Sequence, residues 1–206
     1  MIADFKAPLM TAEEYLKWEE KQPIKYEYIN GKVWAMMGGS LPHNSIALNL
    51  ASALKSHLRK QGCKVFMADA KVGVSSHGPF HYPDIMVTYD SRDQTARKVV
   101  YYPCLIVEVL SPSTEGFDRG KKFRHYRRIE TLKEYVLVDA ERMNVECYRL
   151  NEHNKWELTS YSVEEVATNA TELEIQLTCV NFRSSISSLY EDVVCPDENL
   201  EDSVSS

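Results

Sequence analysis

The run Cys104-Leu-Ile-Val-Glu-Val-Leu110 marks the centre of the predicted fold. It is apolar except for one carboxylate, and such a run is typical of a strand covered on both faces of a sheet. Strand side chains alternate in direction, so Glu108 shares a face with Ile106 and Leu110. A buried charge there is costly unless a partner or a bound ion compensates it. The sequence therefore predicts a buried strand on which Glu108 has a specific partner.

A second carboxylate occupies a similar place in the segment 82–87, Tyr-Pro-Asp-Ile-Met-Val, where Asp84 follows a proline at the start of another apolar strand. Two acids on strands of one sheet indicate a metal site, because oxygen ligands suit Mg²⁺. Each acid also has a plainer interpretation. Asp84 is compatible with a turn carboxylate after Pro83, and Glu108 with a buried ion pair to a helix residue such as Lys122.

The rest of the chain predicts helices and strands in mixed order. A capping box at residues 11–14 predicts a helix over 11–21, and Asn30-Gly31 predicts a hairpin between strands 24–29 and 32–37. A four-residue apolar spacing predicts a helix over 43–61. The further expected strands are 63–69, 71–75, 84–89, 104–110, 134–139, 145–150, 155–161 and 172–177, with loops over 77–82 and 91–97 and helices over 118–129, capped by Asp118, and 184–191.

Length and charge indicate one domain with an acidic extension. The 206 residues carry a formal charge of −6, and residues 191–206 contain six acids and no Lys or Arg. We expect a single α/β domain over 1–190 and a disordered tail over 191–206. The five cysteines are scattered, and no apolar run reaches the ~20 residues that span a bilayer. These features predict a cytoplasmic protein that does not enter a membrane.

Residues 119–128 form the one strongly basic segment, with six Lys or Arg residues. Arg119, Lys121 and Arg124 are the candidate phosphate contacts, because lysine and arginine side chains neutralise nucleic-acid phosphates. By base rate such a segment is more often a solvated helix face, and its place next to the proposed site is what favours phosphate contact.

Two strand carboxylates followed by a lysine resemble the PD-(D/E)xK nuclease core. Pro83-Asp84 and Glu108 match its first two elements, but Leu110 stands where the lysine is usually found. Lys122 on the next helix, with Tyr126 one turn later on the same face, offers a lysine from a different backbone position. Lys121 is the alternative to Lys122.

The chain also resembles a large family of restriction-endonuclease-like proteins, mostly uncharacterised, that is abundant in cyanobacteria. The resemblance covers residues 10–194. It runs through an ordered set of segments at 26–32, 42–43, 83–84, 107–114, 118–122 with Tyr126, and 134–139. It implies a restriction-endonuclease-like mixed β-sheet core flanked by helices, with an N-terminal helix and β-hairpin and additional C-terminal strands. It also implies a metal site at Asp84 and Glu108, a migrated Lys122 and a supporting role for Glu27.

These residues predict a metal-dependent endonuclease that hydrolyses phosphodiester bonds in nucleic acid, with DNA as the expected substrate. Asp84, Glu108 and the Val109 carbonyl are the expected ligands of Mg²⁺ or Mn²⁺, and Lys122 is the expected electrostatic group. The candidate supporting residues are Glu27, His43, Tyr126 and Asp118. A homodimer would let such a protein address two strands. The alternative is an inactive nuclease scaffold that binds nucleic acid or protein, in which Glu108 and Lys122 form a structural ion pair.

Overall fold

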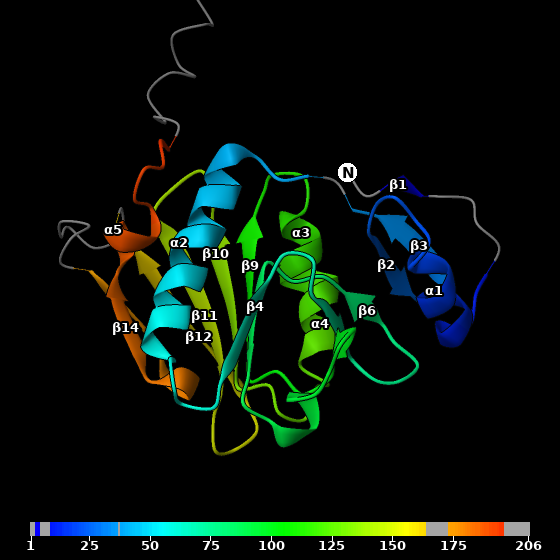
Figure 1. The fold of residues 1–206 in the computed structure, drawn as a ribbon. Coiled ribbons are helices and arrows are strands. Elements are labelled where there is room, and N and C mark those ends of the chain that lie inside the picture. Colours follow the sequence, from blue (N-terminus) through cyan, green and yellow to red (C-terminus); the bar gives the residue numbers. More distant parts are fainter. Residues whose placement is uncertain (1–2, 5–8, 37, 164–172, 196–206) are drawn as a thin grey trace, which may run out of the picture.

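The computed structural model describes residues 3–4, 9–36, 38–163 and 173–195. Within these residues the strands form two six-stranded sheets and a two-stranded ribbon. The larger body lies around the second sheet, and the N-terminal hairpin and helix lie to one side of it (Figure 1). The mixed α/β prediction is confirmed.

The second sheet has β9 (Leu105–Leu110) and β10 (Glu134–Asp139) at its centre, paired in parallel. Its order is β12-β11-β10-β9-β7-β4, and every other pairing in it is antiparallel. The remaining strands are β11 (Asn144–Leu150), β12 (Trp156–Ser162), β7 (Ile85–Thr88) and β4 (Lys64–Met67). The central position of β9 explains why its sequence is apolar on both faces.

The alternating side chains of β9 supply two separate cores. Leu105 and Val107 pack in the main core together with Ile46 and Leu50 of α2 (Leu41–His57). Ile106 packs in a second core together with Tyr126. That second core lies under a continuous helical run of α3 (Glu115–Phe117), the π-helical turn η2 (Asp118–Lys122) and α4 (Phe123–Tyr126). Glu108 therefore points toward this helical run, as the alternation predicts.

Helix α2 begins and packs as the sequence predicts. Ser40 caps its N-terminus, and Ile46, Leu50 and Leu54 are fully buried at four-residue spacing. The helix ends at His57, earlier than the expected residue 61, because left-handed Lys60 begins the turn toward β4. The helix crosses the sheet on the face opposite α3 and α4 (Figure 1).

The N-terminal sheet has the order β1-β3-β2-β6-β5-β8. The predicted hairpin is confirmed in β2 (Tyr26–Ile29) and β3 (Lys32–Ala35), where Asn30 and Gly31 both have positive φ, as a type I′ turn requires. Helix α1 (Ala12–Glu19) has the predicted capping box. The other strands are β1 (Ala3–Asp4), β5 (Lys71–Gly73), β6 (Phe80–His81) and β8 (Val99–Val100).

Several expectations for the middle of the chain were wrong. The expected loop 77–82 contains β6, which is a strand because Phe80 pairs with Tyr28 across the sheet. Asp118 does not cap a helix, because the turn 111–114 already starts the helical run at Glu115 and places Asp118 inside it. The run ends at α4, short of residue 129.

The C-terminal region combines a ribbon and a short helix. Strands β13 (Glu174–Leu177) and β14 (Phe182–Ser185) pair, with 3₁₀ turn η3 (Thr178–Val180) between them, and α5 (Ile186–Leu189) follows. Within the expected helix 184–191, residues 186–189 are helical and residues 184–185 belong to β14. Val193 and Cys195 pack against the main core. The remainder of the expected tail, 196–206, lies outside the described residues, as does residue 172 of an expected strand.

In the described part of the chain, no helix is both long enough and apolar enough to cross a membrane.

A further 3₁₀ turn, η1 (Ser91–Asp93), lies in the expected loop 91–97.

Candidate active site

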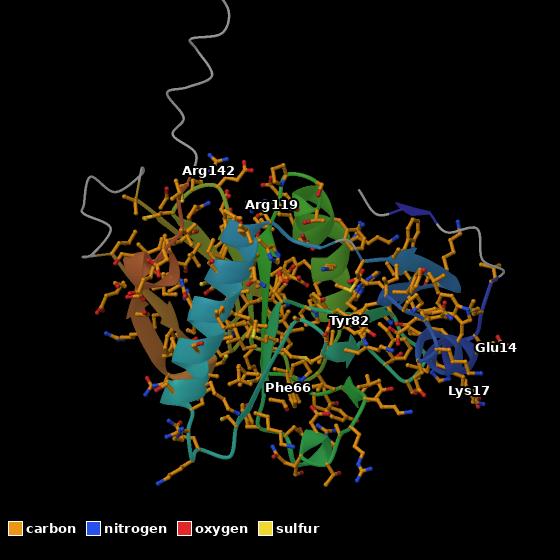
Figure 2. All side chains as sticks on the ribbon, turned by 45° about the horizontal axis from the view of Figure 1, so that its top comes forward. Glu14, Lys17, Phe66, Tyr82, Arg119 and Arg142 are labelled. Carbon is orange, nitrogen blue, oxygen red and sulfur yellow. The ribbon has the colours of Figure 1, made fainter. Side chains whose placement is uncertain are left out.

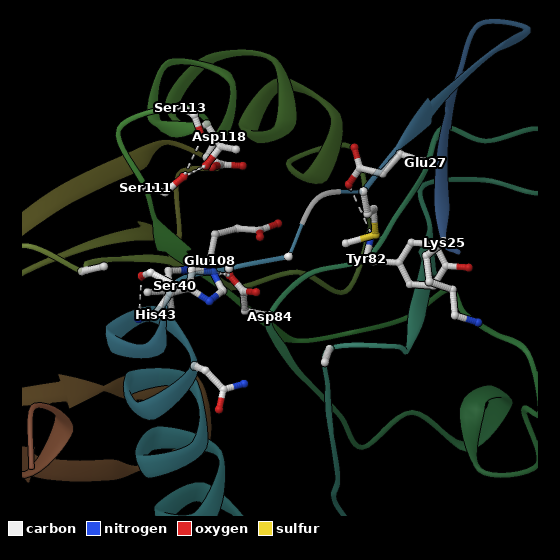
Figure 3. Close-up of a pocket in the computed structure, with 18 of the residues that line it drawn as sticks. Lys25, Glu27, Ser40, His43, Tyr82, Asp84, Glu108, Ser111, Ser113 and Asp118 are labelled. Atoms are coloured by element: carbon white, nitrogen blue, oxygen red, sulfur yellow. Dashed lines mark hydrogen bonds and ion pairs between the residues drawn. The ribbon is translucent and has the colours of Figure 1, made fainter. Parts of the chain in front are cut away.

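A cavity of about 900 Å³ lies between the N-terminal hairpin, the first turn of α2 and the loop that follows β9. Asp84, Glu108, Lys122 and Glu27 all line it. Figure 3 shows Glu108 between Asp84 and His43 on one side and Asp118 on the other, with Glu27 across the cavity. The structure thus brings together acids of β2 and β9, the acid that precedes β7 and a lysine from the helical run.

Asp84 is fixed at the point where two strands part. The pairing of β7 with β9 ends at Ile85 and Val107, so the Val109 N–H has no strand partner on that side. Asp84 Oδ2 accepts this N–H at 2.7 Å. His43 Nε2 lies 3.2 Å from the same oxygen. Burial lowers the pKa of His43, but the Asp84 carboxylate outweighs that effect and raises it above its ordinary value.

Glu108 is almost fully buried and has two partners on one oxygen. Its Oε1 accepts a hydrogen bond from the Tyr126 hydroxyl at 2.8 Å and lies 3.0 Å from Lys122 Nζ. Burial raises the pKa of Glu108 well above its usual range, and Asp118 and Asp84 raise it further against the opposing effect of Lys122. The expected pairing of Glu108 with a helix residue is thus present in the structure.

Lys122 enters the cavity from the π-helical turn. Its Nζ lies 3.0 Å from Glu108, 3.1 Å from Asp118 and 3.6 Å from Glu27. Burial lowers the pKa of Lys122, but these carboxylates outweigh it and raise the pKa well above its ordinary value. Lys121 does not line the cavity. The geometry therefore selects Lys122 from the two lysines that the sequence left open.

Glu27 connects the cavity to two histidines that the sequence did not identify. Its Oε2 lies 3.0 Å from Nδ1 of the fully buried His81, and His81 Nε2 lies 2.9 Å from Nδ1 of the half-buried His125. Burial opposes ionisation of Glu27, but His81 and Lys122 lower its pKa to about 2. Burial and the charge of His81 lower the pKa of His125 to about 4. Glu27 is therefore a buried, ionised partner of Lys122.

The supporting residues have clear positions. Tyr126 holds Glu108, His43 holds Asp84, and Asp118 holds Lys122. Burial raises the pKa of Asp118. Tyr135 donates a hydrogen bond to the backbone carbonyl of Asp118 at 3.1 Å, which fixes the π-helical turn to β10.

The three expected phosphate contacts lie outside the cavity lining. Arg119, labelled in Figure 2, is paired with Glu115 at 2.7 Å and with Glu146, so two carboxylates already occupy its guanidinium. Arg124 is exposed and Lys121 is partly buried, and neither makes an ion pair within the described residues.

The donor set suits a hard divalent cation. In the described part of the chain, no three His, Cys, Asp or Glu side chains are grouped to hold a metal by themselves. The expected third ligand, however, is a backbone oxygen. The N–H and C=O of a strand residue leave the same edge of the strand, so the Val109 carbonyl faces the edge where Asp84 binds the Val109 N–H. Two carboxylates and one carbonyl are ligands that Mg²⁺ and Mn²⁺ accept.

Sequence reasoning missed several residues in or beside the cavity. Trp34, which lies on the hairpin opposite Glu27, and Ser40 and Ser111, which lie in connecting segments, line the cavity. His81 does not line it but contacts Glu27, and it lies in the segment expected to be a loop. The only available signal was for Trp34, whose place on the second strand of the hairpin follows from the Asn30-Gly31 turn.

The architecture and the acid–lysine cluster define a protein of the restriction-endonuclease-like class. A family model described as "Uma2: Putative restriction endonuclease" matches residues 12–180, and the chain belongs to this family.

Similar proteins occur in cyanobacteria. The uncharacterised protein slr1290 of Synechocystis is 39% identical over 158 residues, which cover 77% of this chain and 83% of the relative. The uncharacterised protein sll1609 of the same organism is 35% identical over 153 residues, covering 73% and 86%.

A crystal structure from Anabaena variabilis, of a protein described as a "putative nuclease belonging to DUF820", has the same fold. It superposes with a TM-score of 0.70 at 19% identity, covering 88% of this chain and 98% of the other. The predicted family and fold class are therefore confirmed.

Proposed function

We propose that this protein is a metal-dependent nuclease that hydrolyses phosphodiester bonds in nucleic acid, with DNA as the expected substrate. The observation that carries the proposal is the convergence of Lys122 with Glu108 in a cavity where Asp84 is bound to the neighbouring residue of the same strand, Val109. Membership of the Uma2 family supports it.

Asp84, Glu108 and the Val109 carbonyl would hold Mg²⁺ or Mn²⁺. When bound, the ion would supply Lewis-acid polarisation of the scissile phosphate and a more acidic water. Both carboxylates keep an oxygen for this purpose, since the described partners use Oδ2 of Asp84 and Oε1 of Glu108.

Lys122 has the electrostatic role in this proposal. Its pKa lies well above the ordinary value, so the side chain carries its proton at neutral pH and places positive charge beside the phosphate. Glu27 and Asp118 keep the ammonium in the cavity, and Tyr126 holds Glu108 in its rotamer. His43 restricts Asp84 in the same way.

The second candidate function is an inactive scaffold that binds nucleic acid or protein. One observation favours it: Lys122 already contacts three carboxylates, which is the arrangement of a structural ion pair. A bound cation would compete for Glu108, so metal binding separates the two functions.

The proposal also includes a homodimer in the cytoplasm. A dimer would bring two cavities to one nucleic acid, and light scattering coupled to size exclusion measures the mass in solution.

Plasmid nicking with Mg²⁺ or Mn²⁺ tests the function. We expect wild-type protein to nick, and Asp84→Asn, Glu108→Gln and Lys122→Met to lose at least about 100-fold in rate. Glu152→Gln, an exposed carboxylate outside the cavity, is the matched control and keeps its activity. Isothermal titration with Mn²⁺ gives binding independently of cleavage. A wild type that neither binds the ion nor nicks the plasmid overturns the proposal in favour of the scaffold.

A further inference from the structure

Three groups of the proposed site are nearly buried in the cavity wall, and Asp84 is partly exposed. Glu108 is 3% exposed, Asp118 2% and Lys122 8%. A base-paired duplex is a stiff, wide rod whose backbone curves only at an energetic cost. Its phosphates would meet the rim of the cavity before they reached these side chains. An unpaired nucleotide is narrower and flexible, so it can enter.

The charge of the cavity wall also disfavours a duplex. Six carboxylates and two lysines line it: Glu27, Asp69, Asp84, Glu108, Asp118 and Glu141, with Lys25 and Lys122. Lys122 is already paired with carboxylates, which leaves Lys25 as the lining lysine that makes no ion pair within the described residues. Duplex binding rests on many phosphate contacts at once, and this wall does not supply them.

The hairpin contributes an aromatic side chain where a base would lie. Trp34 is the direct cross-strand partner of Glu27, so the two side chains share one face of the N-terminal sheet. Glu27 faces Lys122, and Trp34 lines the same cavity. The Trp34 indole N–H is buried and has no acceptor among the described residues. Such an unpaired donor weakens a purely structural role for this side chain.

Apolar side chains continue the wall toward solvent. Ile24 is 48% exposed and Val194 85% exposed, and both line the cavity. Exposed apolar side chains beside an aromatic ring are suited to the faces of unpaired bases, which stack with little dependence on sequence.

We propose that the cavity accepts an unpaired nucleotide of single-stranded nucleic acid and that Trp34 is the residue that contacts its base. This inference rests on the proposed function, because it assigns a substrate form to the same site. Plasmid nicking would then occur where the supercoiled duplex is locally unpaired. The proposed function concerns cleavage, whereas this inference concerns binding, which is measurable without cleavage.

The test is fluorescence anisotropy of an end-labelled 20-nucleotide DNA, used as a single strand and annealed to its complement, in Ca²⁺ and in Mg²⁺. An RNA strand of the same sequence separates the two chemistries. We expect the single strand to bind at least 5-fold tighter than the duplex. Trp34→Ala weakens single-strand binding by about 5- to 100-fold, and Trp34→Phe retains most of it, because base–aromatic stacking is of that size.

Trp18→Phe is the matched control, since Trp18 packs against Tyr26 and does not line the cavity. Thermal melting of each variant separates lost binding from lost folding, and Trp34→Phe keeps the test informative where Trp34→Ala does not fold. Duplex binding as tight as single-strand binding, unchanged binding by Trp34→Ala, or no binding of any strand overturns the inference. Trp34-dependent single-strand binding without cleavage in Mg²⁺ or Mn²⁺ supports the inference and overturns the proposed nuclease.

Discussion

Asp84 Oδ2 accepts the Val109 N–H at 2.7 Å, so a side chain replaces the missing strand partner just before β7 begins. One oxygen of Asp84 is thereby committed to the sheet. The same hydrogen bond places the carboxylate beside the strand that carries Glu108.

Because of this hydrogen bond, two substitutions of Asp84 are expected to differ in stability although both lose activity. Asp84→Asn retains an oxygen for the Val109 N–H, whereas Asp84→Ala leaves that N–H without its partner. We expect Asp84→Ala to be less stable than Asp84→Asn by about 1 kcal/mol, while both lose nicking activity. Urea unfolding and plasmid nicking measure the two effects. Equal stability of the two variants would contradict a role for this hydrogen bond in the sheet.

Lys122 is expected to affect stability as well as activity. Lys122→Met leaves buried carboxylates without their cation, so it lowers the free energy of unfolding by about 3–5 kcal/mol. Adding Glu108→Gln to Lys122→Met removes one of those charges and restores part of the loss. A double-mutant cycle by urea unfolding measures the coupling. Additive effects of the two substitutions would show that the 3.0 Å contact is not energetically coupled.

The acid stability of the protein is expected to depend on Glu134. Burial opposes ionisation of Glu134, but hydrogen bonds from the side chain and backbone N–H of Cys179 and from Thr178 outweigh it and lower its pKa below the ordinary value of 4.5. Because the folded state holds this lower pKa, the stabilisation is present above about pH 4.5 and is lost as pH falls further.

Glu134→Gln therefore lowers the free energy of unfolding by about 1–3 kcal/mol at pH 7. The difference from wild type shrinks as pH falls below about 4.5. Urea unfolding at a series of pH values measures it, with the exposed Glu157→Gln as control. A difference that does not change with pH would exclude this carboxylate as the cause.

The basic segment is expected to divide into structural and binding residues. Arg119 is occupied by Glu115 and Glu146, so Arg119→Ala should change stability more than nucleic-acid affinity. Lys121→Ala and Arg124→Ala should weaken nucleic-acid binding without destabilising the fold. Each should make the negative slope of log K for binding against log salt concentration shallower by about 1. Anisotropy titrations at several salt concentrations between about 50 and 200 mM measure this salt dependence of the binding constant. The opposite ranking would assign Arg119 to the interface.

The sequence predicted the elements whose side chains repeat with a clear period. Strand β9 and helix α2 each have enough residues for the alternation or the four-residue spacing to be recognised, and the Asn30-Gly31 turn has the φ values it requires. Strands β6 and β8 have two residues each, so no period exists to detect. They are strands because neighbouring strands supply their partners, which is a tertiary effect.

The candidate site was predictable where a residue type was anomalous in its setting. Glu108 was such a residue, and its near-complete burial among carboxylates and Lys122 explains why. His81 was not anomalous, because nothing local indicates that it lies between Glu27 and His125. The choice of Lys122 over Lys121 depends on which face of the helical run meets the sheet, and the sequence left that choice open.

The π-helical turn Asp118–Lys122 has a consequence for how this site can change by insertion or deletion. A π turn contains one residue more than the α-helical turn it replaces. Deleting Gly120 would restore α-helical spacing, and each residue of an α-helix turns by about 100°. Lys122 and Tyr126 would then rotate together relative to Asp118, and the lysine would leave its contact with that carboxylate, although no side chain of the cluster had been replaced. The cluster therefore depends on the number of residues between Asp118 and Tyr126 as strictly as on their identities.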